Sequence, residues 1–313
     1  MQLLFIIDAP ESLKAYKDTS VAMMRAAQKR GHAVWICEQE SLHWLQGRVA
    51  AAAQRISLAD NDEDWYRAHA VERRPLAGFS ATLMRKDPPF DLEYVTSTWL
   101  LSAAVREGAR VYNAPDAIRD HNEKLAITEF SKFTAPSLVA RRMEDLQGFI
   151  QQHADVVLKR LDGMGGHGVF RVRHDEPNRN VIVETVSELG TRTVMAQRYI
   201  PEITQGDKRV LLIDGQVVPH CLARIPKAGD SRGNLAAGAR GVAQSITARH
   251  REIASALGPV LAQRGLLVVG LDVIGDYLTE VNVTSPTCFR EIQDQTGFDV
   301  SGMFLDALEK KIQ

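Results

Sequence analysis

Three oxygen-bearing side chains near the end of the sequence form its most suggestive group. Asp272 lies in the apolar run VGLDVIG, and Glu280 and Asn282 lie in LTEVNVTSPT. Glu280 and Asn282 are two residues apart, so on a strand they project from the same face. Carboxylate and amide oxygens are hard ligands that suit Mg²⁺ on nucleotide phosphates better than zinc. The alternative is an edge hairpin with a solvated face, which fits Glu280 better than Asp272 because an uncompensated carboxylate in an apolar run is costly.

The turn between Asp272 and Glu280 decides whether the two side chains share a face. A two-residue turn at Gly275-Asp276 would pair Asp272 with Thr279 and put Glu280 on the opposite face. A three-residue connection sets Asp272 directly opposite Glu280, and the next position on that face lies opposite Gly270, whose missing side chain leaves room for an ion. We therefore predict the longer turn, or a bulge of equal effect.

A glycine-rich segment, DGMGGHG at 162–168, formally matches the dinucleotide fingerprint G-x-G-x-x-G. That fingerprint needs a helix after the glycines, whereas residues 169–172 (VFRV) are typical of a strand. No Gly-Lys-Ser/Thr follows, which excludes a Walker A loop. A glycine-rich hairpin between antiparallel strands can instead fold over a triphosphate as a flap. The alternative is a permissive turn, but four glycines are more than a turn needs.

Two lysines stand where such a flap would need them. Lys159 leads into the glycine segment in the run VVLKRLDG, and a buried strand rarely contains a lysine without an anionic partner. Lys124 opens a predicted helix after Asn122-Glu123. From the residues alone, a solvated helix face is the simpler interpretation of Lys124.

Arginines recur at the ends of the predicted strands. Arg209 and Arg224 belong to one hairpin, Arg232 and Arg240 lie in the loop after it, and Arg85-Lys86-Asp87 ends an N-terminal strand. Guanidinium groups suit carboxylates and phosphoryl groups. Each of these arginines alone fits a surface ion pair, so their joint placement is the stronger observation.

The elements that must position these residues begin with alternating strands and helices, which indicate parallel β-α-β units. The predicted N-terminal strands cover 3–8, 33–38, 81–86 and 110–113, the helices cover 18–30 and 92–106, and residues 49–64 form an insertion with one strand. From 139 to 200 we expect a compact α+β unit with antiparallel strands. Asp214-Gly215 predicts a hairpin, and the glycine-rich stretch 226–241 predicts a mobile lid.

Composition sets broad limits on the function. The chain has 313 residues, 45% of them hydrophobic, with 38 basic and 39 acidic side chains. This balance gives no electrostatic reason to expect a nucleic-acid or membrane partner. The opening MQLLFIID is typical of a first strand and not of a signal peptide. Three scattered cysteines argue against a disulfide framework or zinc site and favour the cytoplasm.

The order of these features resembles the ATP-grasp fold, and the motifs resemble the bacterial glutathione synthetase family along nearly the whole chain. The segments that carry the resemblance are LMRKDPPFD, NEKL, LKRLDGMGG, DKRVLLIDG, CLARIP, RGNLAAGARG, VGLDVIGDYLTE and NVTSPTCFREI. Arg160 stands where the family has a proline, and His167-Gly168 also differ, which concerns only the local geometry of the flap.

The resemblance implies an α/β class fold with three parts. These are an N-terminal α/β domain with a parallel sheet (1–122), a small α+β lid domain with the flap (123–200) and a C-terminal antiparallel-sheet domain (201–313). It also implies a cytoplasmic homo-oligomer, a tetramer.

The implied reaction joins γ-glutamylcysteine to glycine through an acyl phosphate, with ATP converted to ADP and phosphate. Mg²⁺, or Mn²⁺, would lie on Asp272, Glu280 and Asn282. The ATP site would comprise Lys124, Lys159, Gly163, Met164, Gly165, Gly166, Gln197, Tyr199, Ile200 and Asp207. Arg209, Arg224 and Arg232 would act on the reacting carboxylate and the intermediate, and Arg85, Lys86, Asp87, Ser285 and Thr287 would hold the substrates. Cys288 would be structural, since the reaction needs no protein nucleophile.

Two other functions stay open at this point. Another ATP-grasp carboxylate–amine ligase, such as a dipeptide ligase or a glutamate-adding enzyme, would share the core motifs. A non-catalytic ATP-binding regulatory protein should have lost a metal ligand or an arginine, and all of them are present.

Overall fold

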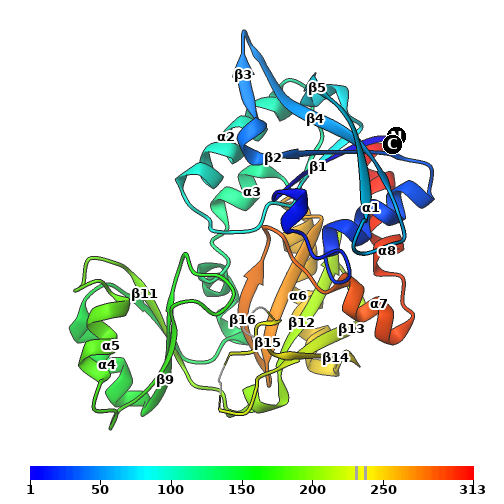
Figure 1. Ribbon diagram of the computed structural model, residues 1–313. Coiled ribbons are helices and arrows are strands. Elements are labelled where there is room, and N and C mark those ends of the chain that lie inside the picture. Colours follow the sequence, from blue (N-terminus) through cyan, green and yellow to red (C-terminus); the bar gives the residue numbers. More distant parts are fainter. Residues whose placement is uncertain (230–231, 236–237) are drawn as a thin grey trace.

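The computed structural model describes residues 1–229, 232–235 and 238–313. Within these ranges the strands form three sheets, and the two termini lie side by side (Figure 1). This is the ATP-grasp architecture that the sequence predicts, with one sheet in each of three successive parts of the chain.

The N-terminal sheet is built around four parallel strands in the order β2-β1-β6-β7. The strands and their helices are β1 (Gln2–Ile7), α1 (Thr19–Lys29), β2 (Ala33–Glu38), β6 (Ala81–Met84), α2 (Leu92–Arg106), β7 (Val111–Tyr112) and α3 (Pro115–Asp120). Asp18 and Asp91 cap α1 and α2 by accepting hydrogen bonds from Val21 N and Tyr94 N. The predicted β-α-β units are therefore confirmed.

Three antiparallel strands extend this sheet beyond β2 and make it mixed. They are β3 (His43–Leu45), β4 (Arg48–Leu58) and β5 (Tyr66–Pro75). The sequence predicted only one of them, because β5 is exposed along almost its whole length and lacks the apolar alternation that marks a half-buried strand.

The small domain has its own sheet and core and stands apart from the body in Figure 1. Its antiparallel strands, in the order β10-β9-β11-β8, are β8 (Ser137–Ala140), β9 (Asp155–Arg160), β10 (Val169–Arg173) and β11 (Val194–Arg198). The helices α4 (Met143–His153) and α5 (Arg179–Val186) cover one face, burying Leu146, Ile150 and Val183 against the sheet. The other face is left for the cavity described below.

The C-terminal sheet is antiparallel, with the order β14-β13-β12-β15-β16. Its elements are β12 (Asp207–Ile213), β13 (Gln216–Ile225), β14 (Arg240–Ser245), α6 (Ala248–Gln263), β15 (Val268–Ile274) and β16 (Tyr277–Asn282). Asp214 and Gly215 both have positive φ, 47° and 77°, as a tight hairpin turn between β12 and β13 requires. The start of β14 lies inside the stretch predicted to be a lid, and part of that prediction falls on residues 230–231 and 236–237, outside the described residues.

The chain ends by returning to its first domain. The helices α7 (Phe289–Thr296) and α8 (Val300–Ile312) pack on α1, and Phe304 of α8 shares a core with Phe5 of β1 and Leu211 of β12. This common core joins the N-terminal and C-terminal sheets into one body, against which the small domain closes the cavity.

Candidate active site

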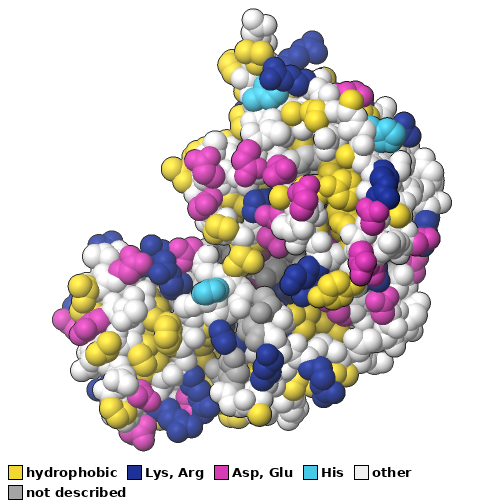
Figure 2. Space-filling view, in the orientation of Figure 1, with side chains coloured by type: hydrophobic (Ala, Val, Ile, Leu, Met, Phe, Trp, Pro, Cys, Tyr) yellow, Lys and Arg dark blue, Asp and Glu magenta, His cyan; other side chains and the backbone are white. Residues whose placement is uncertain are grey.

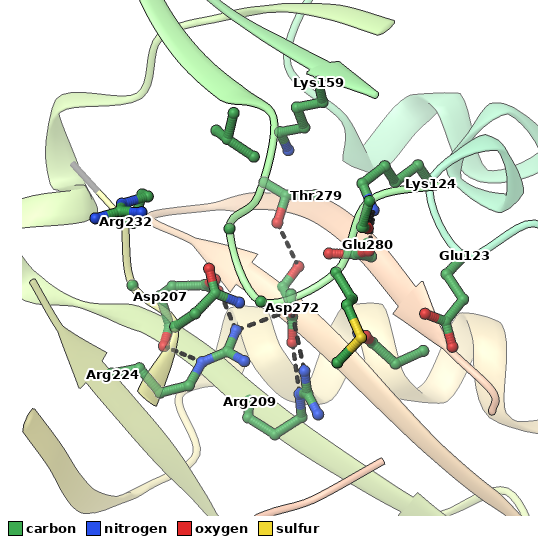
Figure 3. A pocket seen from close by; sticks show the side chains of 18 of the residues that line it. Glu123, Lys124, Lys159, Asp207, Arg209, Arg224, Arg232, Asp272, Thr279 and Glu280 are labelled. Atoms are coloured by element: carbon green, nitrogen blue, oxygen red, sulfur yellow. Dashed lines mark hydrogen bonds and ion pairs between the residues drawn. The ribbon is translucent and has the colours of Figure 1, made fainter. Parts of the chain in front are cut away.

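A cavity of about 300 Å³ lies between the small domain and the C-terminal sheet. The surface is hollowed at this junction (Figure 2), and the side chains that project into the cavity are shown in Figure 3. Most residues singled out from the sequence line it: Asp87, Lys124, Lys159, Gly163, Met164, Gly165, Gly166, Gln197, Tyr199, Ile200, Asp207, Arg209, Arg224, Arg232, Asp272, Glu280, Asn282, Ser285 and Thr287. The tertiary structure thus brings together residues from all three parts of the chain.

The β15–β16 hairpin places Asp272 directly opposite Glu280. The turn itself has two residues, Gly275-Asp276, and the register shifts next to Asp272, where β16 contains one extra residue, Thr279. The three-residue turn that we predicted is wrong, and the alternative, a bulge of equal effect, is confirmed. The Thr279 hydroxyl donates to the Asp272 carbonyl oxygen at 3.2 Å, which stabilises the bulge.

Gly270 lies opposite Asn282, as predicted, but it does not leave room for an ion. A Cβ atom at Gly270 would lie 2.8 Å from Cδ of Arg209, so the Arg209 side chain fills this space. The Asn282 side-chain nitrogen donates to the Gly270 carbonyl oxygen at 3.0 Å. Any ion held by this face must therefore lie beside the Asp272 and Glu280 carboxylates and not above Gly270.

Two buried arginines hold the Asp272 carboxylate. Arg209 Nε lies 2.6 Å from Oδ1, and a terminal nitrogen of Arg224 lies 2.8 Å from Oδ2. Burial alone would raise the pKa of Asp272, but the two guanidinium groups outweigh burial and hold the pKa below its ordinary value. Asp272 is therefore ionised at neutral pH, and Arg209 and Arg224 belong to a buried network and are not surface ion pairs.

Asp207 is the second carboxylate on Arg224, at 2.6 Å. Burial raises the pKa of Asp207 to about 6, although Arg224 opposes the shift. Its Oδ1 atom is buried and accepts no hydrogen bond within the described part of the chain. Gly233 passes so close that a Cβ there would lie 2.7 Å from the Asp207 Cβ. Asp207 thus lines the cavity with one carboxylate oxygen that has no hydrogen-bond partner among the described residues.

Lys124 lies at the centre of the site, between the hairpin and the glycine flap. Its ammonium nitrogen is 2.9 Å from Glu280 Oε1 and 2.6 Å from the carbonyl oxygen of Gly163. The residue is only 6% exposed, so the interpretation of Lys124 as a solvated helical lysine is wrong. Burial lowers the pKa of Lys124, but Glu280 outweighs burial and the net shift is upward.

Lys159 projects from β9 into the cavity near Lys124 (Figure 3). Its ammonium nitrogen donates to Gln197 Oε1 at 2.5 Å, and Gln197 in turn donates to the Ser137 hydroxyl at 3.1 Å. Among the described residues no carboxylate lies within ion-pair distance of Lys159, and burial lowers its pKa. A half-buried lysine whose ammonium group has only a neutral partner is suited to receive an anionic ligand.

The glycine flap touches the loop after β13. Gly166 has φ +85°, and a Cβ there would lie 3.0 Å from Asn234 Oδ1 and 3.1 Å from Cδ of Arg232. At Gly163 a Cβ would lie 2.7 Å from the carbonyl oxygen of His167. The glycines are therefore required by the backbone conformation and by close approach, beyond what a permissive turn needs.

The family resemblance assigned Arg85 and Lys86 to substrate binding. Neither residue lines the cavity. Arg85 is buried and donates to the carbonyl oxygen of Pro286 at 2.8 Å and to the Ser20 hydroxyl at 3.1 Å. Lys86 pairs with Asp8 at 2.6 Å. Lys86 is therefore held by the N-terminal domain, and Arg85 links that domain to the loop that follows β16. The neighbouring Asp87 does reach the cavity and accepts a hydrogen bond from Ser285.

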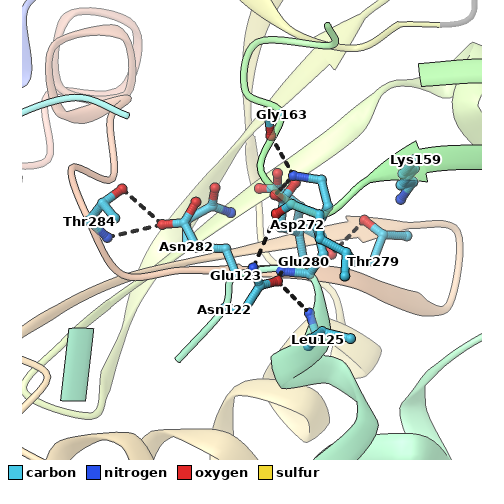
Figure 4. A network of polar contacts seen from close by, with 12 residues as sticks. Asn122, Glu123, Leu125, Lys159, Gly163, Asp272, Thr279, Glu280, Asn282 and Thr284 are labelled. Carbon is cyan, nitrogen blue, oxygen red and sulfur yellow. Dashed lines mark hydrogen bonds and ion pairs between the residues drawn. The ribbon is translucent and has the colours of Figure 1, made fainter. Parts of the chain in front are cut away.

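Glu123 is a cavity residue that the sequence did not single out. Its Oε1 accepts hydrogen bonds from Val283 N (2.8 Å), Thr284 N (3.0 Å) and the Thr284 hydroxyl (2.9 Å), as Figure 4 shows for Thr284. Burial, and secondarily Glu280, raise the pKa of Glu123. The one sequence feature that could have pointed to Glu123 is its position directly before Lys124, a residue already assigned to the site.

Two features are absent from the described residues. No helix there is long and apolar enough to cross a bilayer. No group of three or more His, Cys, Asp and Glu side chains there is arranged to hold a metal ion. The predicted metal site has only two carboxylates, with an amide as the third member, and basic side chains contact both carboxylates. Cys37, Cys221 and Cys288 are free and buried.

Comparison with solved structures supports the fold. The chain superposes on D-cycloserine synthetase DcsG with a TM-score of 0.71 at 15% identity, with all of both chains covered. It superposes on the ATP-grasp ligase PsnB, complexed with precursor peptide PsnA2 and AMPPNP, with a TM-score of 0.62 at 19% identity, covering 99% of this chain and 98% of PsnB. At these identities the likeness establishes the ATP-grasp fold.

Comparison of sequences is more specific. Residues 1–119 match the family model "Prokaryotic glutathione synthetase, N-terminal domain", and residues 123–297 match "Prokaryotic glutathione synthetase, ATP-grasp domain". The glutathione synthetase of Ralstonia nicotianae is 58% identical, with 99% of this chain and 96% of the relative covered. That of Nitrosomonas europaea is 55% identical, with 100% and 98% covered. The chain therefore belongs to the prokaryotic glutathione synthetase family of ATP-grasp ligases.

Proposed function

We propose that this protein joins γ-glutamylcysteine to glycine at the cavity, with ATP converted to ADP and phosphate. The observation that carries the proposal is the register of the β15–β16 hairpin. It sets Asp272 opposite Glu280, with Lys124 on one carboxylate and two arginines on the other. In a chain of this family, that arrangement has the charges needed for phosphoryl transfer to a carboxylate.

A carboxylate is a poor electrophile at neutral pH, so it must be activated before an amine can attack. An oxygen of the cysteinyl carboxylate attacks the γ-phosphorus of ATP, the bond from that phosphorus to the bridging oxygen breaks, and ADP leaves. The glycine nitrogen, as the free amine, then attacks the acyl carbon; the bond to the phosphate oxygen breaks, phosphate leaves and the nitrogen releases a proton. Both steps need positioning and charge neutralisation and no protein nucleophile.

The nucleotide would occupy the end of the cavity that faces the small domain. Lys124 and Lys159 would bind the phosphates, since both side chains line the cavity. The backbone of 163–166 would cover the phosphates. Gln197, Tyr199 and Ile200 would flank the adenine, and the free Asp207 oxygen would accept from the ribose.

The donor set on the hairpin fits a hard divalent cation. Asp272, Glu280 and Asn282 offer two carboxylates and an amide oxygen from facing positions, which suit Mg²⁺ or Mn²⁺. When bound, the cation would neutralise charge on the nucleotide phosphates. Arg209 and Arg224 hold the pKa of Asp272 below its ordinary value, so this carboxylate is ionised and ready for the cation.

Arginines would act at the reacting atoms. Arg209 and Arg224 line the cavity beside Asp272, where they would stabilise the substrate carboxylate and the acyl phosphate. Arg232, on the loop that touches the flap, would close over the intermediate and exclude water that would hydrolyse it. Asp87, Ser285 and Thr287 would hold the substrates at the other end, and Arg85 would support them through the Pro286 carbonyl.

The test is ADP release from a matrix of substrates. The assay combines γ-glutamylcysteine, D-alanine or L-glutamate with and without glycine, and with and without Mg²⁺. We expect ADP only when γ-glutamylcysteine, glycine and Mg²⁺ are present together. Equal turnover on D-alanine alone would point to a dipeptide ligase, and ATP binding without turnover on any pair would point to a regulatory protein.

We also propose that the protein works in the cytoplasm as a homotetramer. The three free, buried thiols are consistent with a reducing compartment, and the tetramer rests on the family resemblance. Light scattering of the purified protein measures the oligomeric state directly, and a monomer would contradict it.

A further inference from the structure

Strand β16 is an edge strand, because among the described residues β15 is the only strand that pairs with it. Alternate N–H groups of such a strand point away from the sheet and need other partners. Glu123 supplies them. Its backbone carbonyl oxygen accepts from Val281 N at 2.9 Å, and its side-chain Oε1 accepts from Val283 N at 2.8 Å. One residue therefore takes the place of a neighbouring strand.

The same carboxylate oxygen continues past the end of β16. It accepts from Thr284 N at 3.0 Å and from the Thr284 hydroxyl at 2.9 Å. Asn282 therefore lies between two residues, Val281 and Val283, whose backbone N–H groups both donate to Glu123. Ser285 directly follows Thr284. On the other side, the next residue along the chain is Lys124, which pairs with Glu280.

We propose that Glu123 is a positioning residue that fixes Asn282 and Ser285 relative to the Lys124–Glu280 pair by completing the outer edge of β16. The proposal rests on the proposed function for the meaning of Asn282 and Ser285, since one lies on the metal side and the other on the substrate side. What matters in this role is the reach of the side chain and an acceptor oxygen at its end. Its negative charge is secondary.

Two substitutions separate reach from charge. Glu123→Gln keeps the length and an amide oxygen that can accept all three bonds, but it removes the charge. Glu123→Asp keeps the charge, but it is one methylene too short to reach Val283 and Thr284. Positioning therefore predicts that the Gln variant works and the Asp variant fails, whereas a role for the charge predicts the opposite.

Glu107 provides a matched control in the N-terminal domain. Its carboxylate accepts from the backbone N–H of Val49, at 2.9 and 3.2 Å, and it does not line the cavity. Glu107→Asp shortens a comparable contact to a strand. It should therefore reproduce any general loss of stability without an effect on the site.

Supporting residues around metal ligands typically contribute about 10–100-fold to metal affinity or activity. We expect Glu123→Asp to lower kcat by about 50-fold and to raise the Mg²⁺ concentration for half-maximal activity by about 10-fold. Glu123→Gln should stay within about 5-fold of the wild type in both, because a neutral acceptor replaces a charged one. Glu107→Asp should match the wild type in both.

A second readout does not depend on turnover. Electron paramagnetic resonance of Mn²⁺ with a non-hydrolysable ATP analogue measures how tightly the protein holds the metal–nucleotide pair. Glu123→Asp should weaken Mn²⁺ retention by about 10-fold and Glu123→Gln should restore it. If the wild type makes no peptide but this pattern holds, the proposed function fails and the positioning role stands. Wild-type Mn²⁺ retention in Glu123→Asp, or equal loss in the Asp and Gln variants, overturns the positioning role.

Discussion

The side chain of Arg209 occupies the space that a Cβ atom on Gly270 would need. Cδ of Arg209 lies 2.8 Å from that position, and its guanidinium group continues to Asp272, with Nε 2.6 Å from Oδ1. Arg209 cannot move aside freely, because its far end is held by a buried ion pair. The absence of a side chain at position 270 is therefore what lets Arg209 reach both Asp272 and the cavity.

Gly270→Ala should consequently displace Arg209 and lower kcat by about 10–100-fold, since small misplacements of a charged group are costly in phosphoryl transfer. Steady-state kinetics measure the loss. Gly148 of α4 is the matched control, because a Cβ there meets nothing within 4 Å. Gly148→Ala should leave kcat unchanged and raise the free energy of unfolding by about 0.5–1 kcal/mol. A Gly270→Ala variant with normal kcat would show that Arg209 does not act at the reacting atoms.

Glu280→Gln and Asp272→Asn should both abolish turnover, but their effects on stability should differ. Asp272→Asn leaves the buried Arg209 without a carboxylate partner, while Arg224 keeps Asp207, and this should lower the free energy of unfolding by about 3–5 kcal/mol. Glu280→Gln should cost about 1 kcal/mol, because Lys124 keeps its bond to the Gly163 carbonyl oxygen. Urea unfolding with kinetics on the same samples separates the two effects. Near-normal kcat in either variant would contradict the metal assignment.

Acid should remove the stabilisation that Asp272 provides. Arg209 and Arg224 hold its pKa below the value of about 3.9 that an aspartate has in the unfolded chain. The contribution is therefore complete above about pH 5 and is lost as the pH falls below about 4. Urea denaturation between pH 3 and pH 7 should show the difference in unfolding free energy between wild type and Asp272→Asn shrinking toward acid pH. A difference that stays constant over this range would contradict the ion-pair account.

Arg232→Ala should uncouple ATP hydrolysis from peptide formation. Arg232 packs beside Gly166 where the flap meets the 232–235 loop, so its loss opens the cover over the acyl phosphate. Water then competes with glycine, and kcat for the peptide falls while ADP release persists. The measurement is the ratio of ADP to peptide product at saturating glycine. One ADP per peptide in this variant would argue against a water-excluding role.

Local patterns predicted most of the fold. The helix at 92–106 has the predicted bounds, because the capping Asp91 before it and the glycine after it are local features of the sequence. The hairpin at Asp214-Gly215 followed from turn chemistry. Strand β5 and helix α7 were not predicted, since β5 is almost wholly exposed and the α7 segment carries few apolar residues.

Residue type, spacing and the family resemblance singled out most of the residues that line the cavity, but they did not predict the partners of those residues. The sequence suggested that Lys124 was solvated, yet Lys124 is buried against Glu280, which lies 156 residues away along the chain. The sequence placed Arg85 on the substrate, and the structure turns Arg85 toward Pro286. Both outcomes depend on how separate sheets pack, which no local pattern reports.

The sequence by itself determined which functional groups the protein has, how they alternate along each strand, and that Glu280 and Asn282 project from the same face of one strand. These follow from the two-residue period of a strand, which is fixed by covalent geometry. Only the tertiary structure decided that a bulge at Thr279 sets the register, that Arg209 fills the space beside Gly270, and that Glu123 completes the edge of β16. Those features depend on close packing and on hydrogen bonds between residues far apart in the sequence, and such contacts exist only once the three sheets have come together.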